Sequence, residues 1–240
     1  MAIPQQASIL HRWKLDEISG NRADSVGTCT LTDNATVGYS DSCKQGYYSA
    51  DFEETNAEYL SATAASSSDM NFTSSNFSVA FWVKPENLDI DTYIKRGTHA
   101  VDGWYIQHYT SRLRFYTSQA SVVQEVISSI NPITSGNFSH ISIIRNGSSG
   151  YIYVDGANKT ETSPTLINPV ATNSVLYIGR YSSVYPENDV DGLMDDIIIW
   201  NVALTSTEVL ALYNTYPIAS GTGRVPYLGA RDSAMYKELE

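Results

Sequence analysis

The chain lacks most of the features that quickly assign a protein to a functional class. Its 240 residues include only two cysteines, Cys29 and Cys43, and 15 lysines and arginines against 26 aspartates and glutamates, for a net charge of −11. Lysines and arginines form no cluster, and nucleic-acid binding needs one, so we expect no nucleic-acid partner. There is also no run of about eighteen apolar residues, so we expect no membrane insertion.

Common motifs of enzymes and zinc sites are missing as well. None of the four histidines has a Cys or His partner at zinc spacing, and there is neither a G-x-S-x-G elbow nor a phosphate-binding glycine loop. The first residues, MAIPQQASIL, lack the charged and apolar regions of a signal peptide. The acidic balance nevertheless fits an extracellular protein or one carried on a particle or cell surface, which is our expectation. Whether Cys29 and Cys43 form a disulfide stays open, because sequence does not place their Cα atoms.

What the chain does contain is a series of short apolar or alternating runs separated by turn residues such as Asn146-Gly147 and Asp155-Gly156. These runs predict strands near residues 10–16, 26–32, 46–52, 58–61, 76–84, 92–96, 103–109, 112–117, 121–127, 138–145, 150–155, 174–180 and 192–201. So many short strands without intervening helices indicate an all-β fold, an antiparallel β-sandwich. We expect one domain over residues 1–217 and a tail over 218–240, whose final Leu239-Glu240 is typical of residues added by cloning.

The last predicted strand differs from the others because both of its faces carry apolar groups. Ile197 and Ile199 alternate with Ile198 and Trp200, which is typical of a strand buried on both sides. A short helix is predicted directly after it, at about residues 205–214. Thr205 and Glu208 have the spacing of a capping box at its start.

Six segments carry a family resemblance. In chain order they are WKLDEISGNRADSVG at 13–27, FSVAFWVKP at 77–85, HISIIRNG at 140–147, IYVDG at 152–156, LYIGR at 176–180 and GLMDDIIIWNVALTSTEVLALYNTYP at 192–217. Together they resemble the laminin-G-like domains of the concanavalin A-like lectin/glucanase superfamily over nearly the whole chain. The resemblance implies a jelly-roll sandwich with one short C-terminal helix and, most commonly, carbohydrate binding.

The resemblance also implies a structural calcium ion between the N-terminal segment and the last strand. The matching residues are Asp24 and Asp195, with backbone carbonyls near Asn21 and Gly27 and a water completing the oxygen ligands. Asp195 has the phase of the inward-facing Ile197 in a regular strand, and an inward carboxylate needs a neutralising partner. The alternative is that Asp195 accepts backbone hydrogen bonds and that Asp24 is an ordinary turn residue.

Glucanases of the superfamily carry an E-x-D-x-x-E motif that aims several carboxylates at one groove, as glycoside hydrolysis requires. The chain has no such motif. Glu53 and Glu54 are adjacent and so point to opposite faces, while Glu187, Asp189 and Asp191 alternate in a loop-like segment after Pro186. We therefore expect no enzyme and no catalytic residue, and glucan hydrolysis is the disfavoured alternative.

Strand alternation singles out a polar-aromatic set on the phase opposite the core. In the predicted strands 103–109, 112–117 and 150–155, the core phase holds mostly Leu, Ile, Val and Phe. The other phase holds Tyr105, Gln107, Tyr109, Arg114, Tyr116, Tyr151 and Tyr153. If the strands are neighbours, these residues form a band suited to sugars, because aromatic rings cover C–H faces and Arg and Gln hydrogen-bond hydroxyls. Two alternatives stay open: tyrosine as an ordinary strand residue, and a protein contact surface.

We therefore expect a non-catalytic recognition module that binds a glycan or glycoprotein and holds a structural Ca²⁺. The alternative is a structural or adhesion domain that contacts the protein subunits of a larger assembly, such as a virion, a tail fibre or a cell-surface protein. The fold hosts many functions, so the functional step is an analogy.

Overall fold

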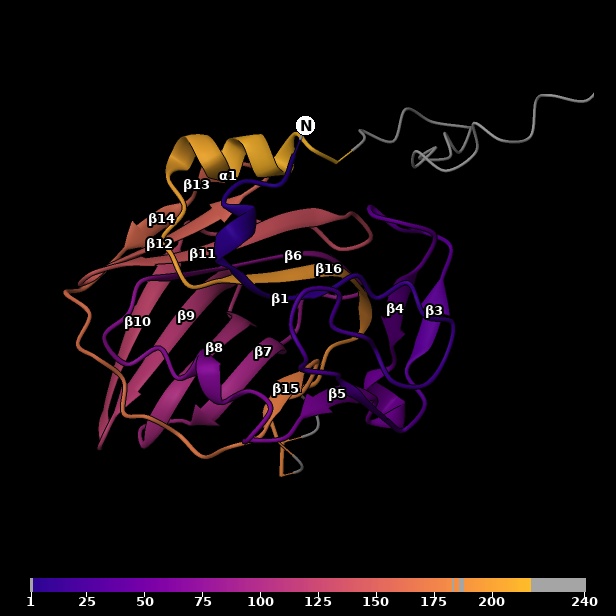
Figure 1. Cartoon of the computed structure of the whole chain (residues 1–240), viewed down its shortest axis with the longest axis horizontal. Coiled ribbons are helices and arrows are strands. Elements are labelled where there is room, and N and C mark those ends of the chain that lie inside the picture. Colours follow the sequence, from indigo (N-terminus) through magenta and orange to yellow (C-terminus); the bar gives the residue numbers. More distant parts are fainter. Residues whose placement is uncertain (1, 183, 186–187, 217–240) are drawn as a thin grey trace, which may run out of the picture.

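The computed structural model describes residues 2–182, 184–185 and 188–216, which form two antiparallel sheets packed face to face (Figure 1). In order across it, the first sheet contains β13 (Ala157–Asn158), β12 (Ser149–Val154), β11 (Ser139–Asn146), β6 (Phe77–Pro85), β16 (Gly192–Trp200), β4 (Ser49–Phe52) and β3 (Gly38–Ser40), with β1 (Ile9–Trp13) also paired to β16. The second sheet contains β14 (Thr160–Thr162), β10 (Val122–Ser128), β9 (Arg112–Gln119), β8 (Asp102–Tyr109), β7 (Asp91–Thr98), β15 (Leu176–Ile178), β5 (Tyr59–Ala62) and β2 (Thr32–Asn34). One helix, α1 (Ser206–Tyr213), and three 3-10 turns, η1 (Gln6–Ser8), η2 (Glu54–Asn56) and η3 (Ser68–Met70), complete the described elements.

The predicted all-β antiparallel sandwich with one late helix is confirmed, and most predicted strands are found within a few residues of their expected ends. The predicted strand at 26–32 is wrong, since only Thr32 belongs to a strand. The reason is local: the Asp24 carboxylate accepts backbone hydrogen bonds from Val26, Gly27 and Cys29 and holds this segment in a turn. Sequence patterning also missed β3, β13 and β14, which are too short to show alternation.

The main core lies between the two sheets. The first sheet contributes the inward faces of β6, β11 and β16, including Phe77, Phe81 and Ile143. The second contributes Trp104 and Ile106 of β8 and the inward residues of β9 and β10. Each of these strands keeps its apolar residues on alternate positions, so that the pleat turns one apolar face toward the other sheet.

A second apolar layer covers the outer face of the first sheet. Helix α1 lies over this face (Figure 1), and its Val209 and Leu212 pack against Trp82, Ile198 and Trp200. Strand β16 is therefore buried on both faces, as its sequence predicts.

Helix α1 begins at the predicted capping box. The Thr205 side chain accepts a hydrogen bond from the Glu208 backbone N–H, and the Glu208 carboxylate accepts one from the Thr205 backbone N–H at 2.8 Å. These two bonds satisfy donors that a helix start otherwise leaves open. The prediction of a helix over about 205–214 is confirmed.

The cysteines of the structure are thiols. Cys29 is buried in the main core, where burial raises the pKa of its thiol to about 11. Cys43 lies 3.8 Å from the carbonyl oxygen of Gly46. No helix in the described part of the chain is long and apolar enough to cross a membrane. Pro217 and the predicted tail 218–240 lie outside the described residues, so the predicted domain boundary stays a prediction.

Candidate functional site

The candidate site is a hollow on the outer face of the second sheet, formed on β8, β9 and β10. Its volume is about 470 Å³, within the usual range for small-molecule sites. The described residues that line it are Ile90, His99, Tyr105, Gln107, Tyr109, Arg114, Tyr116, Glu125, Tyr181, Tyr185 and Asn188. Five of the seven residues predicted to bind a ligand are among them: Tyr105, Gln107, Tyr109, Arg114 and Tyr116.

Strand register brings these side chains together. Tyr105 of β8 is paired with Tyr116 of β9, which in turn is paired with Glu125 of β10. Two residues further along β8, Gln107 is paired with Arg114 of β9 on the same face. Residues paired across adjacent strands share a face, so the alternating polar phase of β8 and β9 becomes one continuous surface.

Tyrosine rings form the wall of the hollow. The rings of Tyr105 and Tyr116 are stacked, with centroids 4.2 Å apart and planes at 12°. Tyr181 meets Tyr105 edge-on at 5.9 Å, and Tyr185 meets Tyr181 at 6.0 Å. The Tyr105 hydroxyl lies 2.6 Å from His99 Nδ1. Because Tyr105 and Tyr116 are held on several sides, the wall is preformed.

The inner tyrosines are neutral at physiological pH. Tyr105 and Tyr116 are both nearly inaccessible, and burial raises the pKa of each phenol above its ordinary value. Both hydroxyls therefore stay neutral and can act as hydrogen-bond donors at physiological pH.

The polar groups of the hollow are positioned by one another. Arg114 Nη1 donates to Glu125 Oε2 at 2.6 Å, and its guanidinium carbon lies 4.8 Å from the Tyr109 ring centroid. Gln107 Nε2 donates to Thr92 Oγ1 at 3.0 Å. These contacts fix the side chains around the space that a ligand would fill, which lowers the entropic cost of binding.

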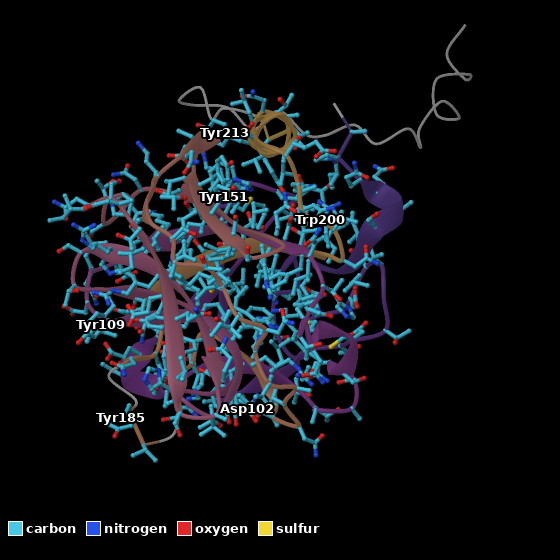
Figure 2. All side chains as sticks on the ribbon, turned by 90° about the vertical axis from the view of Figure 1, so that its left-hand side faces the viewer. Asp102, Tyr109, Tyr151, Tyr185, Trp200 and Tyr213 are labelled. Carbon is cyan, nitrogen blue, oxygen red and sulfur yellow. The ribbon has the colours of Figure 1, made fainter. Side chains whose placement is uncertain are left out.

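Two predicted ligand residues are elsewhere, and their prediction is corrected. Tyr151 and Tyr153 belong to β12 of the first sheet and pack in the layer beneath α1. In Figure 2, Tyr151 lies on the same side of the molecule as Tyr213 of the helix, whereas Tyr109 and Tyr185 lie on another part. The strand phase was right for β12, but the condition that it neighbours β8 and β9 is not met, because β12 belongs to the other sheet.

Other residues that line the hollow were not predicted from the sequence. Tyr181, Tyr185 and Asn188 come from the segment between β15 and β16, His99 directly follows β7, and Glu125 lies in β10. Strand alternation gives no signal for side chains in irregular segments. The local richness of this segment in tyrosine was the one available hint.

Hydrogen-bond donors surround the carboxylate of Asp24, one of the two residues of the predicted calcium bridge. Its Oδ1 accepts the backbone N–H groups of Arg12, Val26 and Gly27, and its Oδ2 accepts that of Cys29 and lies 2.6 Å from His11 Nδ1. Both oxygens thus face hydrogen-bond donors, and Gly27 contributes its N–H to this arrangement. The side-chain Oδ1 of Asn21 accepts a hydrogen bond from the Asp33 backbone N–H.

Asp195 is not on the core face, which corrects its predicted phase. A bulge interrupts the pairing of β16 with β6 between Asp195 and Ile198, and Asp196 has a positive φ of 44°. The extra residue shifts the alternation by one, so Asp195 shares the outer face with its partner Trp82. Its Oδ2 accepts the backbone N–H groups of Lys44 and Gln45 at 2.6 and 2.9 Å, and burial raises the pKa of its carboxyl.

The sequence left open the alternative that Asp195 accepts backbone hydrogen bonds and that Asp24 is a turn residue. The hydrogen bonds at both residues match this alternative. Among the described residues, no group of three or more His, Cys, Asp or Glu side chains is arranged to hold a metal ion. Calcium binding by the chain stays a prediction.

A family model supplies the identification. The model described as "Concanavalin A-like lectin/glucanases superfamily" matches residues 56–210, more than half of the chain. The chain belongs to this superfamily. No curated protein matches it in sequence.

Three solved structures with the same fold share 16–19% sequence identity with this chain. The binding domain of Paraclostridial Mosquitocidal Protein 1 is 16% identical with a TM-score of 0.71, over 87% of this chain and 52% of that one. Domain 4 of AbnA, an extracellular arabinanase of Geobacillus stearothermophilus described in complex with arabinotriose, is 19% identical with a TM-score of 0.63, over 86% of this chain and 98% of that one. The botulinum neurotoxin serotype G binding domain is 18% identical with a TM-score of 0.66, over 86% of this chain and 51% of that one. The chain thus spans about half the length of the toxin binding domains, and these likenesses show the fold.

Proposed function

We propose that the chain is a non-catalytic glycan-binding module whose binding site is the hollow on β8, β9 and β10. The observation that carries the proposal is the preformed tyrosine wall, in which Tyr105 and Tyr116 are stacked and buried while the rings of Tyr109 and Tyr185 are more exposed. Aromatic faces cover the C–H faces of sugar rings, and the neighbouring polar groups hydrogen-bond hydroxyls.

The acids of the hollow support the non-catalytic part of the proposal. Among the described residues that line it, Glu125 is the single carboxylate, and it is paired with Arg114. Glycoside hydrolysis uses two carboxyl groups flanking the scissile bond. Asp189, which alternation had offered as a catalytic candidate, is buried against Arg180 at 2.9 Å.

Descriptions of the structural relatives agree with a sugar ligand. One is the arabinanase domain in complex with arabinotriose, and another is a botulinum neurotoxin DC binding domain in complex with SialylT. The arabinanase is described as extracellular, which fits our proposal that this chain works outside a cell or on a particle surface.

The test is binding of the whole chain to a glycan panel, followed by titration calorimetry with the best ligand. Tyr109 and Tyr185 are 37% and 50% exposed, so replacing both with alanine should leave stability within about 0.5 kcal/mol per site. If each ring contributes about 0.5–1.5 kcal/mol to stacking, the double variant should bind at least about fivefold more weakly.

Tyr47→Ala is the matched control, because Tyr47 is 68% exposed and does not line the hollow. It should bind as tightly as the unmodified chain. Unchanged affinity in Tyr109→Ala/Tyr185→Ala would place the ligand elsewhere. Absence of any glycan ligand would favour the alternative of a domain that contacts protein subunits.

A further inference from the structure

The hollow contains one positive and one negative side chain of fixed charge. Among its described lining residues, Arg114 and Glu125 are the basic and acidic members, and their ion pair is 2.6 Å long. Both are partly shielded from solvent, with side-chain exposures of 19% and 34%. The pair is therefore screened less than a fully exposed one, and its net charge is zero.

Both terminal nitrogens of Arg114 already donate a hydrogen bond, so an incoming anion meets a guanidinium that is already paired with Glu125 and Thr110. Nη1 donates to Glu125, and Nη2 donates to Thr110 Oγ1 at 3.1 Å. Nε has no partner, but it is buried out of reach of solvent. The Tyr109 ring covers one face of the guanidinium. A carboxylate or sulfate entering the hollow would have to displace Glu125 or bind beside its negative charge.

Lys95, the next cation on this face, does not offer an incoming anion a free positive charge. Lys95 of β7 is paired with Tyr105 and so shares its face, but it is only 7% exposed. Its Nζ donates to the Tyr181 carbonyl at 2.8 Å and lies 3.9 Å from the Tyr181 ring centroid. The net charge of −11 for the whole chain also disfavours the approach of anions.

We infer that the hollow selects neutral saccharides, and that Glu125 sets this selectivity by neutralising Arg114. The inference rests on the proposed function, since it names the ligand class of the same site. Sugar hydroxyls can share hydrogen bonds with an intact Arg–carboxylate pair, whereas an acidic sugar competes with Glu125 for the same donors.

The experiment compares each neutral oligosaccharide with its acidic counterpart, such as lactose with sialyllactose and galactotriose with trigalacturonate. The unmodified chain should bind the neutral member at least about tenfold more tightly, and its affinity should not change between low and high salt. Glu125→Gln keeps the side-chain shape and releases the charge of Arg114. We expect it to shift the acidic-to-neutral affinity ratio by about tenfold toward the acidic sugar.

Glu161→Gln is the matched control. Glu161 forms an ion pair of the same length, 2.6 Å, with Arg112 outside the hollow, so this variant makes the same change in net charge without freeing Arg114. Its affinity ratio should equal that of the unmodified chain.

The outcomes separate the two proposals. Preference of the unmodified chain for the acidic sugars, with affinity that falls as salt rises, overturns the neutral selectivity and leaves glycan binding standing. An affinity ratio that Glu125→Gln leaves unchanged, in a variant whose melting curve shows it folded, overturns the role of Glu125. Binding of neither sugar class by the unmodified chain overturns the proposed function together with the inference.

Discussion

Asp196 should contribute strongly to the stability of the fold. Replacing it with asparagine should lower the free energy of unfolding by about 3 kcal/mol. Its carboxylate accepts hydrogen bonds from Arg12 Nε at 2.7 Å and Nη2 at 3.0 Å, and from the Tyr216 hydroxyl at 2.5 Å. These bonds join β1, the bulge of β16 and the end of the α1 region. Burial lowers the pKa of Arg12, but the hydrogen bond and charge of Asp196 outweigh it, so that the pKa is raised overall.

The magnitude follows from burial. Asp196 is fully buried and the Arg12 side chain is 15% exposed. Removing one partner of a buried ion pair costs about 3–5 kcal/mol, because the other charge is left uncompensated. The slight exposure of Arg12 places the cost at the lower end. Asparagine also tolerates the positive φ of this position, so the change adds little backbone strain.

The assay is urea denaturation at neutral pH, with the midpoints compared at a common slope. Glu161→Gln again serves as a control, because the Glu161 side chain is 52% exposed and its pair with Arg112 should contribute no more than about 0.5 kcal/mol. A loss below about 1 kcal/mol in Asp196→Asn would refute the reasoning, since the buried pair would then behave like a surface pair.

Two further predictions concern stability. Burial raises the pKa of Asp91 from 3.8 to about 8, and its Oδ2 has no partner. A carboxyl with a raised folded-state pKa favours folding while it is protonated, so its contribution is lost as pH rises from about 4 toward 8. Asp91→Asn should therefore match the unmodified chain near pH 4 and exceed it in stability near pH 8; a difference in unfolding free energy that does not vary with pH would contradict this. Chelation tests calcium separately: if the chain holds the predicted ion, EDTA should lower the melting temperature and added Ca²⁺ should restore it. An unchanged melting temperature would leave hydrogen-bonded Asp24 and Asp195 as the alternative.

Local patterns of the sequence determined much of the architecture. The capping spacing of Thr205 and Glu208 predicted where α1 begins, because the two hydrogen bonds involve residues only three positions apart. Alternation predicted which side chains of β8 and β9 face outward, because the pleat has a period of two whatever the strand pairs with. Five residues of the hollow were therefore identified without knowledge of the fold.

Patterns failed where local geometry departs from regularity. The bulge at Asp196 adds one residue to β16 and moves Asp195 from the expected core face to the outer face. The alternation of residue types along a strand does not reveal such an insertion. Similarly, Asp24 gathers three backbone N–H groups into a turn where alternation favoured a strand.

The tertiary structure alone decided which strands share a sheet. β12 carries outward tyrosines just as β8 does, yet Tyr153 is buried beneath α1 in the first sheet while Tyr105 lines the hollow of the second. It also brought Tyr181 and Tyr185, more than sixty residues after β9 in the chain, against Tyr105 and the rest of the wall. The sequence determines the phase of each strand because that depends on neighbouring residues, whereas the partner of each face depends on long-range pairing and packing of the whole chain.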